Sequence, residues 1–265
     1  MNLFAFLARA AVTQLRVLRT ILVRDTRTRF GGKGGSFTYL VAIGLPLGHL
    51  LCLMLVPIFL HPSSPIGSEF AVFAATGVLP YILSLYPSRM MMLCLNDNAP
   101  LLQFPIVRPP DLIMARAAME IVVALTVAMI LLLLLYVANY EVVPVDSAEA
   151  TAAIFSAIYF GVSVGFVSAV LLRLTPAWMF IQIGTMLSLY VSSGAFFLVR
   201  NLPASVRELI SYNPLFHCVE WLRLAYFAGY GDEMLSRQYL LGVSTALVLF
   251  GMLLERLVRP RLLVT

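Results

Sequence analysis

Six long apolar segments, separated by shorter stretches that hold most of the polar residues, dominate the pattern of this chain. They cover residues 37–60, 70–94, 116–138, 148–172, 177–198 and 239–258. A transmembrane helix needs about 20 apolar residues to cross a hydrocarbon layer about 30 Å thick, and each segment is close to that length. The pattern therefore predicts an all-α fold, a single polytopic membrane domain over residues 1–265 with six transmembrane helices.

Composition supports this class, and the basic residues predict an orientation. The chain is 61% hydrophobic and 12% charged, with a mean hydropathy of +0.93, whereas soluble domains carry about 25% charged residues. Arginines gather before the first segment, between the second and third, and after the sixth, but residues 61–69 and 140–150 contain no Arg or Lys. The positive-inside rule then places both termini in the cytoplasm. The three cysteines have no paired spacing, so we expect neither a disulfide nor a metal site.

Residues 1–36 are predicted to form an amphipathic helix and a hinge on the cytoplasmic side. On a helical wheel Arg16, Arg19 and Arg24 share one side and apolar residues the other, which is typical of a helix lying against anionic membrane lipids. The alternative is a topology signal with no further role. The glycines at 31–35 lack the spacing of a phosphate-binding loop, so no nucleotide cofactor is expected on this chain. Any ATP and Mg²⁺ would belong to a separate partner chain.

The loop at residues 96–111 is unusually apolar for a solvated connection. Prolines bound a predicted two-turn helix, with Asp97 or Asn98 as its cap. Apolar side chains on such a helix indicate docking to another protein or, equally, packing onto the chain's own surface. The candidate coupling residues are Leu101, Leu102, Gln103, Phe104 and Arg108.

Polar residues within the apolar segments are candidates for lining a hydrated channel. The alternative for each is a hydrogen bond between helices. Residues 161–165 (GVSVG) predict a close helix contact, and Arg116 and Glu120 have the spacing of an i,i+4 ion pair. The channel candidates are His49, Gln182, Ser188, Tyr190 and Ser192.

Residues 201–230 are predicted to form two short helices, about 203–211 and 214–228, which are too short to cross the membrane. They can dip into it and return on the periplasmic side. Asn213 and Pro214 suit the start of the second helix, and His217, Glu220 and Arg223 then form one i,i+3 row. We expect Glu220 to pair with Arg223 and His217 to face a passage. A purely bracing role for the row is the alternative.

Three stretches carry a resemblance to a known family. They are RTRFGGKGGSFTYL at the first segment, LLQFPIVRPPDLIMARAAME between the second and third, and SGAFFLVRNLPASVRELISYNPLFHCVEWLRLAYF between the fifth and sixth. Their order resembles the membrane subunit of ABC-2 type exporters, the branch that exports capsular polysaccharide, O antigen and teichoic acid. Length and small loops most resemble the capsular polysaccharide permeases of Gram-negative bacteria.

The resemblance implies an inner-membrane homodimer with a polysaccharide channel between its two copies. It implies two copies of a cytoplasmic ATPase docked on the loop from Leu101 to Arg108, and a gate at residues 201–230. A periplasmic co-polymerase and an outer-membrane pore would complete the system, with no nucleic acid involved. Relatives often carry a Trp near the start of the first segment, where this chain has Phe37 and Tyr39, so the resemblance defines the cytoplasmic gate less closely.

Two other classes compete with this interpretation. An intramembrane transferase acting on lipid-linked glycans or acyl groups would use His217 and Glu220 as acid and base, but no third group for such a site is apparent. A secondary transporter usually shows internal repeats and charges at the middle of its helices, and this sequence shows neither clearly. The transferase would also leave the apolar loop at 96–111 unexplained.

Overall fold

The computed structural model describes residues 14, 16–26, 35–60, 65, 66, 69–231 and 233–263, and these residues contain helices and no strand. This confirms the predicted all-α fold. Residues 27–34, which include most of the predicted hinge, lie outside the described part. Besides a helical stretch at 16–26, the elements are α2 (Gly35–Leu60), α3 (Phe70–Asp97), η1 (Ala99–Gln103), α4 (Pro109–Val137), α5 (Ser147–Leu174), α6 (Trp178–Val191), η2 (Val199–Asn201), α7 (Ala204–Ile210), α8 (Pro214–Tyr226) and α9 (Arg237–Leu263).

Four of these helices are long and apolar enough to cross a membrane: α3, α4, α5 and α9. The apolar stretch Leu40–Val56 of α2 and the helix α6 are shorter. Helices α2 to α6 and α9 overlap the six predicted apolar segments. Helix α4 begins earlier than predicted, at Pro109. The chain is thus a multi-pass, all-α membrane protein.

The fifth predicted segment, 177–198, is helical only as far as Val191. Ser192 and Ser193 turn their hydroxyls back onto the carbonyls of Ser188 and Tyr190, and Gly194 follows with a φ of +77°. A left-handed glycine commonly ends a helix, because a side chain disfavours that conformation. The apolar residues after Val191 therefore fold back into the protein and do not extend the helix.

Helices α3 and α5 form the centre of the bundle, and small residues let them approach closely. A Cβ atom at Gly161 would lie 2.5 Å from the carbonyl oxygen of Ser84, and one at Gly165 would lie 2.8 Å from the Cβ of Met91. The Ser84 hydroxyl donates to the carbonyl of Ala157 across this contact, at 2.9 Å. The close contact predicted at residues 161–165 is confirmed.

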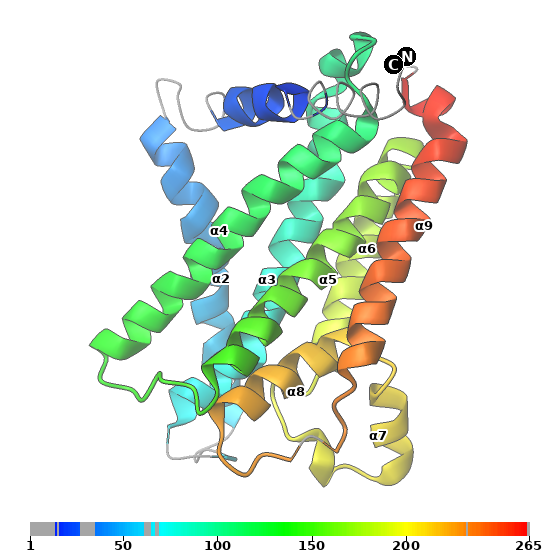
Figure 1. The fold of residues 1–265 in the computed structure, drawn as a ribbon. Helices are drawn as coiled ribbons and strands as arrows, with labels where there is room; N and C mark the ends of the chain where they lie inside the picture. Colours follow the sequence, from blue (N-terminus) through cyan, green and yellow to red (C-terminus); the bar gives the residue numbers. More distant parts are fainter. Residues whose placement is uncertain are drawn as a thin grey trace, which may run out of the picture.

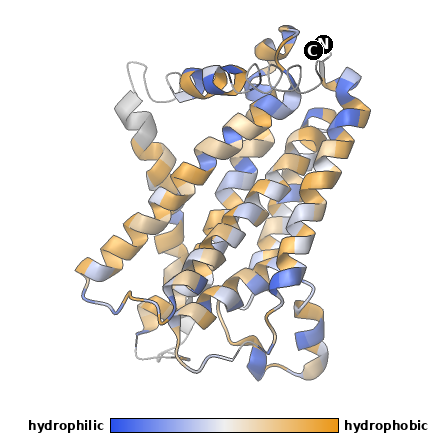
Figure 2. Ribbon diagram, in the orientation of Figure 1, coloured by the Kyte–Doolittle hydropathy of each residue, from blue (hydrophilic) through white to orange (hydrophobic). Residues whose placement is uncertain are grey.

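Figure 1 shows the long helices side by side, with residues 16–26 lying across them at one end. The last turns of α9 lie at this end too, which we call the terminal end. Helices α7 and α8 lie at the opposite end, the hairpin end. Hydrophobic residues cover most of the length of the long helices, and hydrophilic residues gather mainly at the two ends (Figure 2). The two candidate sites lie at these ends.

Candidate functional site

At the terminal end, residues 16–26 present an apolar side to the bundle and a basic side to the surroundings. Ile21 is buried, whereas Arg16, Arg19 and Arg24 are exposed. This arrangement agrees with the predicted amphipathic helix. Arg24 differs from the other two arginines, because its Nη1 donates to Oδ1 of Asn98 at 3.2 Å and so ties the helix to the end of α3.

The loop after α3 is tighter than predicted. Residues Ala99–Gln103 form a 3₁₀ helix, not a two-turn α-helix. The predicted cap is wrong for Asn98, whose side-chain amide turns back to donate to the carbonyl of Cys94 at 3.0 Å. Its oxygen is engaged by Arg24. Asn98 therefore stands at the N-cap position of η1 without a side-chain capping bond, and its side chain instead joins residues 16–26 to the end of α3.

The candidate coupling residues divide between the core and the surface. Leu102 is 7% exposed and shares a hydrophobic cluster with Ile21, so it packs onto the chain's own surface. Leu101 is half-buried beside them. Phe104 and Ile106 are 58% and 60% exposed, so they are the apolar side chains available to a partner. Gln103 and Arg108 are also exposed.

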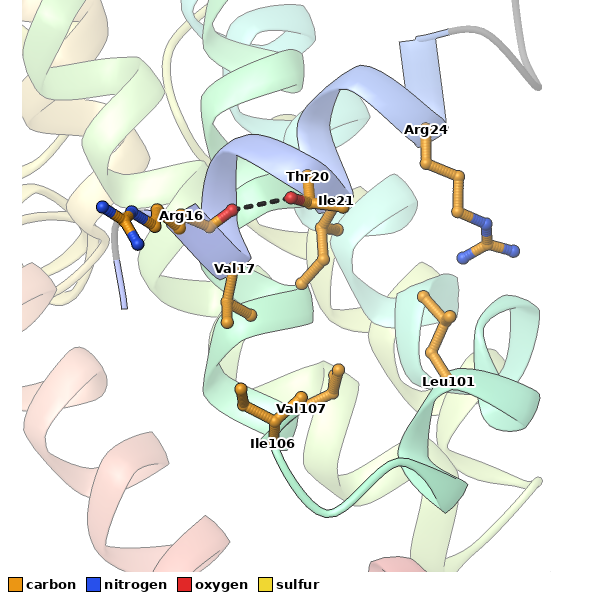
Figure 3. Close-up of a pocket in the computed structure, with 8 residues that line it drawn as sticks. All are labelled: Arg16, Val17, Thr20, Ile21, Arg24, Leu101, Ile106 and Val107. Carbon is orange, nitrogen blue, oxygen red and sulfur yellow. Dashed lines mark hydrogen bonds between the residues drawn. The ribbon is translucent and has the colours of Figure 1, made fainter. Parts of the chain in front are cut away.

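A groove of about 450 Å³ separates the helix at 16–26 from this loop. Figure 3 shows Val17 and Ile21 above Val107 and Ile106, with Arg24 extending over the Leu101 side. The groove is apolar with arginine side chains at its rim. The helix at residues 16–26 and the loop after α3 therefore border one groove.

Two carboxylates that the sequence interpretation did not single out fix the ends of α4 and α9 here. Asp111 is buried and accepts from the backbone N–H of Arg108 at 3.0 Å and from the side-chain amide of Gln14. Glu255 is 2% exposed and forms a two-point pair with Arg259, with both N–O distances 2.9 Å. Only the i,i+4 spacing of the second pair is visible in the sequence.

At the hairpin end, Asn213 organises the start of α8. Its Oδ1 accepts from the N–H of Leu215 at 2.8 Å, which confirms the predicted N-cap. Its amide nitrogen donates to the carbonyl of Leu189 at 2.7 Å and to the hydroxyl of Ser192 at 2.9 Å. Asn213 therefore joins the end of α6 to the start of α8, with Pro214 in the first turn.

Glu220 and Arg223 lie together as predicted, but the carboxylate has a closer partner. Nη1 of Arg223 is 3.9 Å from Oε1 of Glu220, whereas the hydroxyl of Tyr230 donates to the same oxygen at 2.7 Å. Burial raises the pKa of Glu220, and the bond from Tyr230 and the nearby Arg223 charge oppose this. Sequence spacing did not predict Tyr230, because it lies beyond the end of α8.

Arg223 is fully buried and binds the chain that follows α6. Its Nη2 donates to the carbonyl of Ala195 at 3.2 Å and its Nη1 to that of Phe197 at 3.3 Å. Its guanidinium lies 4.4 Å from the ring centre of Phe73 in α3. One cation thus connects α8, α3 and the irregular segment after α6, which favours the bracing role.

His217 lies inside the protomer, contrary to the expectation that it faces a passage. It is 2% exposed, its Nε2 is 2.9 Å from the carbonyl of Ser211, and its Nδ1 accepts from the N–H of Ser236 at 3.2 Å. A neutral ring with its proton on Nε2 satisfies both bonds. Burial lowers the pKa of His217, which favours this neutral form.

The same end contains a second ion pair that the sequence interpretation missed. Glu149, at the start of α5, accepts from Trp221 of α8 and pairs with Arg237 of α9 at 3.1 Å. The Arg237 guanidinium also lies 5.4 Å from the Trp221 ring centre. Both carboxylate oxygens therefore hold α8 against α9 and α5.

The predicted channel residues fall in different surroundings. Nδ1 of His49 is 3.4 Å from the hydroxyl of Tyr86, and Tyr190 stacks on Tyr81 with ring centres 4.0 Å apart. Tyr190 and Gln182 are buried within the protomer, whereas Ser188 is exposed on α6. Ser192 is half-buried against Asn213. Of this set, Ser188 is the residue on an open face of the single chain.

No group of three or more His, Cys, Asp or Glu residues in the described part of the chain is arranged to hold a metal ion. His217 and Glu220, the proposed acid and base of a transferase, are both buried; both ring nitrogens of His217 and Oε1 of Glu220 are in hydrogen bonds to the protein. The arrangement is that of a structural joint between helices.

Comparison with known proteins gives a consistent result. The family model of ABC-2 type transporters matches residues 99–227, a range that begins at η1, ends just after α8 and includes the α7–α8 pair. The chain is 27% identical to the polysialic acid transport protein KpsM of Escherichia coli over 242 residues, which cover 90% of this chain and 92% of the relative.

Two further relatives are similar over comparable lengths. The capsule polysaccharide export inner-membrane protein CtrC of Neisseria meningitidis is 28% identical over 247 residues, covering 90% of this chain and 89% of its own length. The corresponding protein BexB of Haemophilus influenzae is 24% identical over 254 residues, covering 92% and 91%. The chain is therefore similar to ABC-2 type transporters over residues 99–227 and to capsule polysaccharide export and polysialic acid transport proteins along most of its length.

Proposed function

We propose that this chain is the membrane-spanning subunit of an ATP-driven exporter that moves capsular polysaccharide from the cytoplasm to the periplasm across the inner membrane. The similarity to three capsule export and polysialic acid transport proteins along about nine-tenths of the chain carries the proposal. In this proposal the protein is a transport subunit and not an enzyme, and the exported polysaccharide is lipid-linked.

The proposed topology has six spans, α2 to α6 and α9, with both termini in the cytoplasm. The distribution of arginines supports it, because the terminal end holds the exposed Arg16, Arg19 and Arg24 and the basic last turns of α9. The hairpin end, with α7 and α8, is then periplasmic. Helices α7 and α8 would be re-entrant and form the periplasmic side of the pathway.

Two copies of the chain would enclose the polysaccharide channel. A channel for a hydrated polymer needs hydroxyl and aromatic groups and few fixed charges, and Ser188 offers a hydroxyl on the exposed side of α6. The apolar residues around it, Ile181, Ile183 and Leu187, are 50%, 45% and 54% exposed in the single chain. Such an apolar surface requires contact with lipid or with the second copy.

ATP and Mg²⁺ would bind to two copies of a separate cytoplasmic ATPase. Phe104 and Ile106 are the exposed apolar pair at the terminal end, and they would insert into that partner as its principal anchors. Ile106 also lines the groove shown in Figure 3, which would link this contact to residues 16–26. A periplasmic co-polymerase and an outer-membrane pore would receive the polymer beyond α8.

Deletion of the gene in its native host distinguishes transport from synthesis. Loss of an exporter subunit leaves full-length polysaccharide inside the cell and none on the surface, whereas loss of a transferase leaves the polymer absent or truncated. Chain length measured on cytoplasmic and surface extracts decides between these results. Affinity purification of the restored protein should recover an ATPase chain, and chemical analysis of the retained polymer separates capsule from O antigen and teichoic acid.

A further inference from the structure

A cavity of about 280 Å³ lies between α5, α6 and α9, separate from the two sites described above. Its walls are mainly apolar, and Pro214 at the start of α8 is part of its lining. The apolar wall is formed by Phe160, Val164, Val167, Met186, Leu189 and Leu247. A cavity with these walls does not attract water along most of its length, because each ordered water needs two to four polar partners.

Three polar side chains in the same wall have buried atoms without a hydrogen-bond partner among the described residues. They are the hydroxyl of Ser168, the indole nitrogen of Trp178 and both amide atoms of Gln182. Ser168 is 1% exposed and Gln182 is 4% exposed. Leaving such groups unpaired inside a protein costs free energy, and an occupant of the cavity that accepts hydrogen bonds would remove that cost.

The polar atoms are gathered at one end of the cavity. Ser168 lies in the last two turns of α5, and Trp178 and Gln182 lie in the first two turns of the antiparallel α6, so all three are at the terminal end. The cavity then extends along α6 to Leu189, which is about 16 Å from Trp178 along the helix axis. Its shape suits a long apolar ligand with a polar group at one end.

We propose that this cavity binds one acyl chain of a glycerophospholipid, with the ester carbonyl accepting hydrogen bonds from Trp178 and Gln182. Tryptophan favours the level of the lipid headgroups, and the chain of a lipid in that leaflet points toward the bilayer centre, as the cavity does. The exposed apolar faces of α6 and α9, with Ile183 and Leu253 among them, permit entry from the bilayer. The inference depends on the membrane embedding of these helices and not on the exported polymer.

The test is quenching of Trp178 fluorescence by a phosphatidylglycerol with brominated acyl chains, added to the full-length protein in detergent. Subtracting the signal of a Trp178→Phe variant isolates Trp178 and leaves Trp221 unchanged. We expect saturable quenching with about one lipid per protomer. Gln182→Leu should raise the half-saturating lipid concentration about threefold or more, since it removes one hydrogen bond in the membrane. Val243 lines the cavity, so the larger side chain of Val243→Phe should occupy the space of the acyl chain and abolish the saturable phase.

Ser188→Leu is the matched control, because it removes a polar group from the exposed side of the same helix and should leave the saturable phase unchanged. Thermal unfolding and gel filtration of each variant establish that it is folded. Quenching that rises linearly and equally in all variants would show only bulk partitioning and overturn the proposal. So would a Trp178 signal insensitive to lipid but altered by dimerisation, which would assign the cavity to a second copy of the chain.

Discussion

Tyr230 donates a hydrogen bond of 2.7 Å to Oε1 of Glu220, and this bond is much shorter than the 3.9 Å between that oxygen and Arg223. Tyr230 follows the end of α8, whereas Glu220 lies in the middle of that helix. The bond therefore holds the chain after α8 against the helix. Arg223 meanwhile binds the carbonyls of Ala195 and Phe197. The buried carboxylate therefore has two partners with separate structural roles.

Removing either member of the buried ion pair should destabilise the protein strongly. Glu220→Ala leaves a fully buried guanidinium without its carboxylate, a loss of roughly 3–5 kcal/mol for a buried pair. Glu220→Ala combined with Arg223→Ala should cost less than the sum of the two single changes, because the ion pair is lost only once. Unfolding temperature in detergent and surface polysaccharide in cells are the two measurements. Additive losses in the double variant would contradict the pairing.

Tyr230→Phe should weaken the same site by a smaller amount, about 1.5–3 kcal/mol, because it removes one hydrogen bond to a charged group and leaves the ion pair in place. Tyr212→Phe is the matched control, since the Tyr212 side chain is 65% exposed at the same end. Comparison of the two unfolding temperatures checks the prediction. Equal values would mean that the Tyr230 hydroxyl adds nothing to stability.

The docking prediction depends on Phe104 and no longer on Leu102. Phe104→Asp should release the ATPase while the membrane domain unfolds at an unchanged temperature, because the side chain is 58% exposed. An anchor at the centre of an interface commonly contributes about 2 kcal/mol or more. Leu102→Asp should instead destabilise the domain, because it places a charge in the cluster around Ile21.

Val143→Asp is the control for Phe104→Asp, because Val143 is 79% exposed in the loop before α5, at the other end of the bundle. Yield of the co-purified ATPase is the quantity to compare across the three variants. Normal recovery with Phe104→Asp would exclude this side chain as an anchor and leave Ile106 and the groove to be tested.

Side-chain contacts between residues near one another in the sequence could be predicted, and contacts between distant residues could not. The Asn213 cap, the Arg223 pairing and the close contact at Gly161 follow from local spacing, and the structure contains all three. Tyr230 reaches Glu220 through a turn after α8, and no periodicity predicts such a contact.

The failures at the loop have the same origin. Leu102 shares its buried cluster with Ile21, which lies 81 residues earlier in the chain, and Asn98 accepts a hydrogen bond from Arg24 of the same N-terminal helix. The sequence pattern identified the loop as apolar, but which of its side chains stay exposed is decided by tertiary packing. His217 is similar, because its partners Ser211 and Ser236 come from both sides of α8.

The stability of the hairpin end should fall in mild acid because of His217. Burial holds its pKa below the ordinary value of 6.5, so as pH falls below about 6.5 the unfolded chain takes up a proton before the folded one does. The stabilisation that comes from neutral His217 is therefore fully present above pH 6.5. It decreases as the pH falls from 6.5 to the folded-state pKa of His217. Protonation of Nδ1 also breaks the bond from Ser236.

His217→Gln should remove this contribution to the pH dependence, because its amide can still donate near the Ser211 carbonyl and does not titrate. Unfolding temperatures of both proteins between pH 7.5 and 5.0 give the comparison. All other titrating groups are shared, so the difference between the two curves reports His217. Parallel curves would show that the histidine is not neutralised by its surroundings.

Two glycine-to-alanine changes should have opposite effects on stability. Gly161 lies in the contact between α3 and α5, and Gly184 lies on α6 with open space beside it. At Gly161 the new Cβ would lie 2.5 Å from the Ser84 carbonyl oxygen and 2.6 Å from its Cα, and backbone atoms cannot move aside cheaply. The helices must separate, at a cost of about 1–3 kcal/mol, and the bond from Ser84 to Ala157 lengthens.

At Gly184 of α6 a Cβ would meet nothing within 4 Å in the single chain. Gly184→Ala should therefore stabilise the monomer by about 0.4–1 kcal/mol through reduced chain entropy. Unfolding temperatures measured at low protein concentration test both changes. A loss at Gly184 that appears only in the dimer would instead mean that α6 lies against the second copy at this glycine.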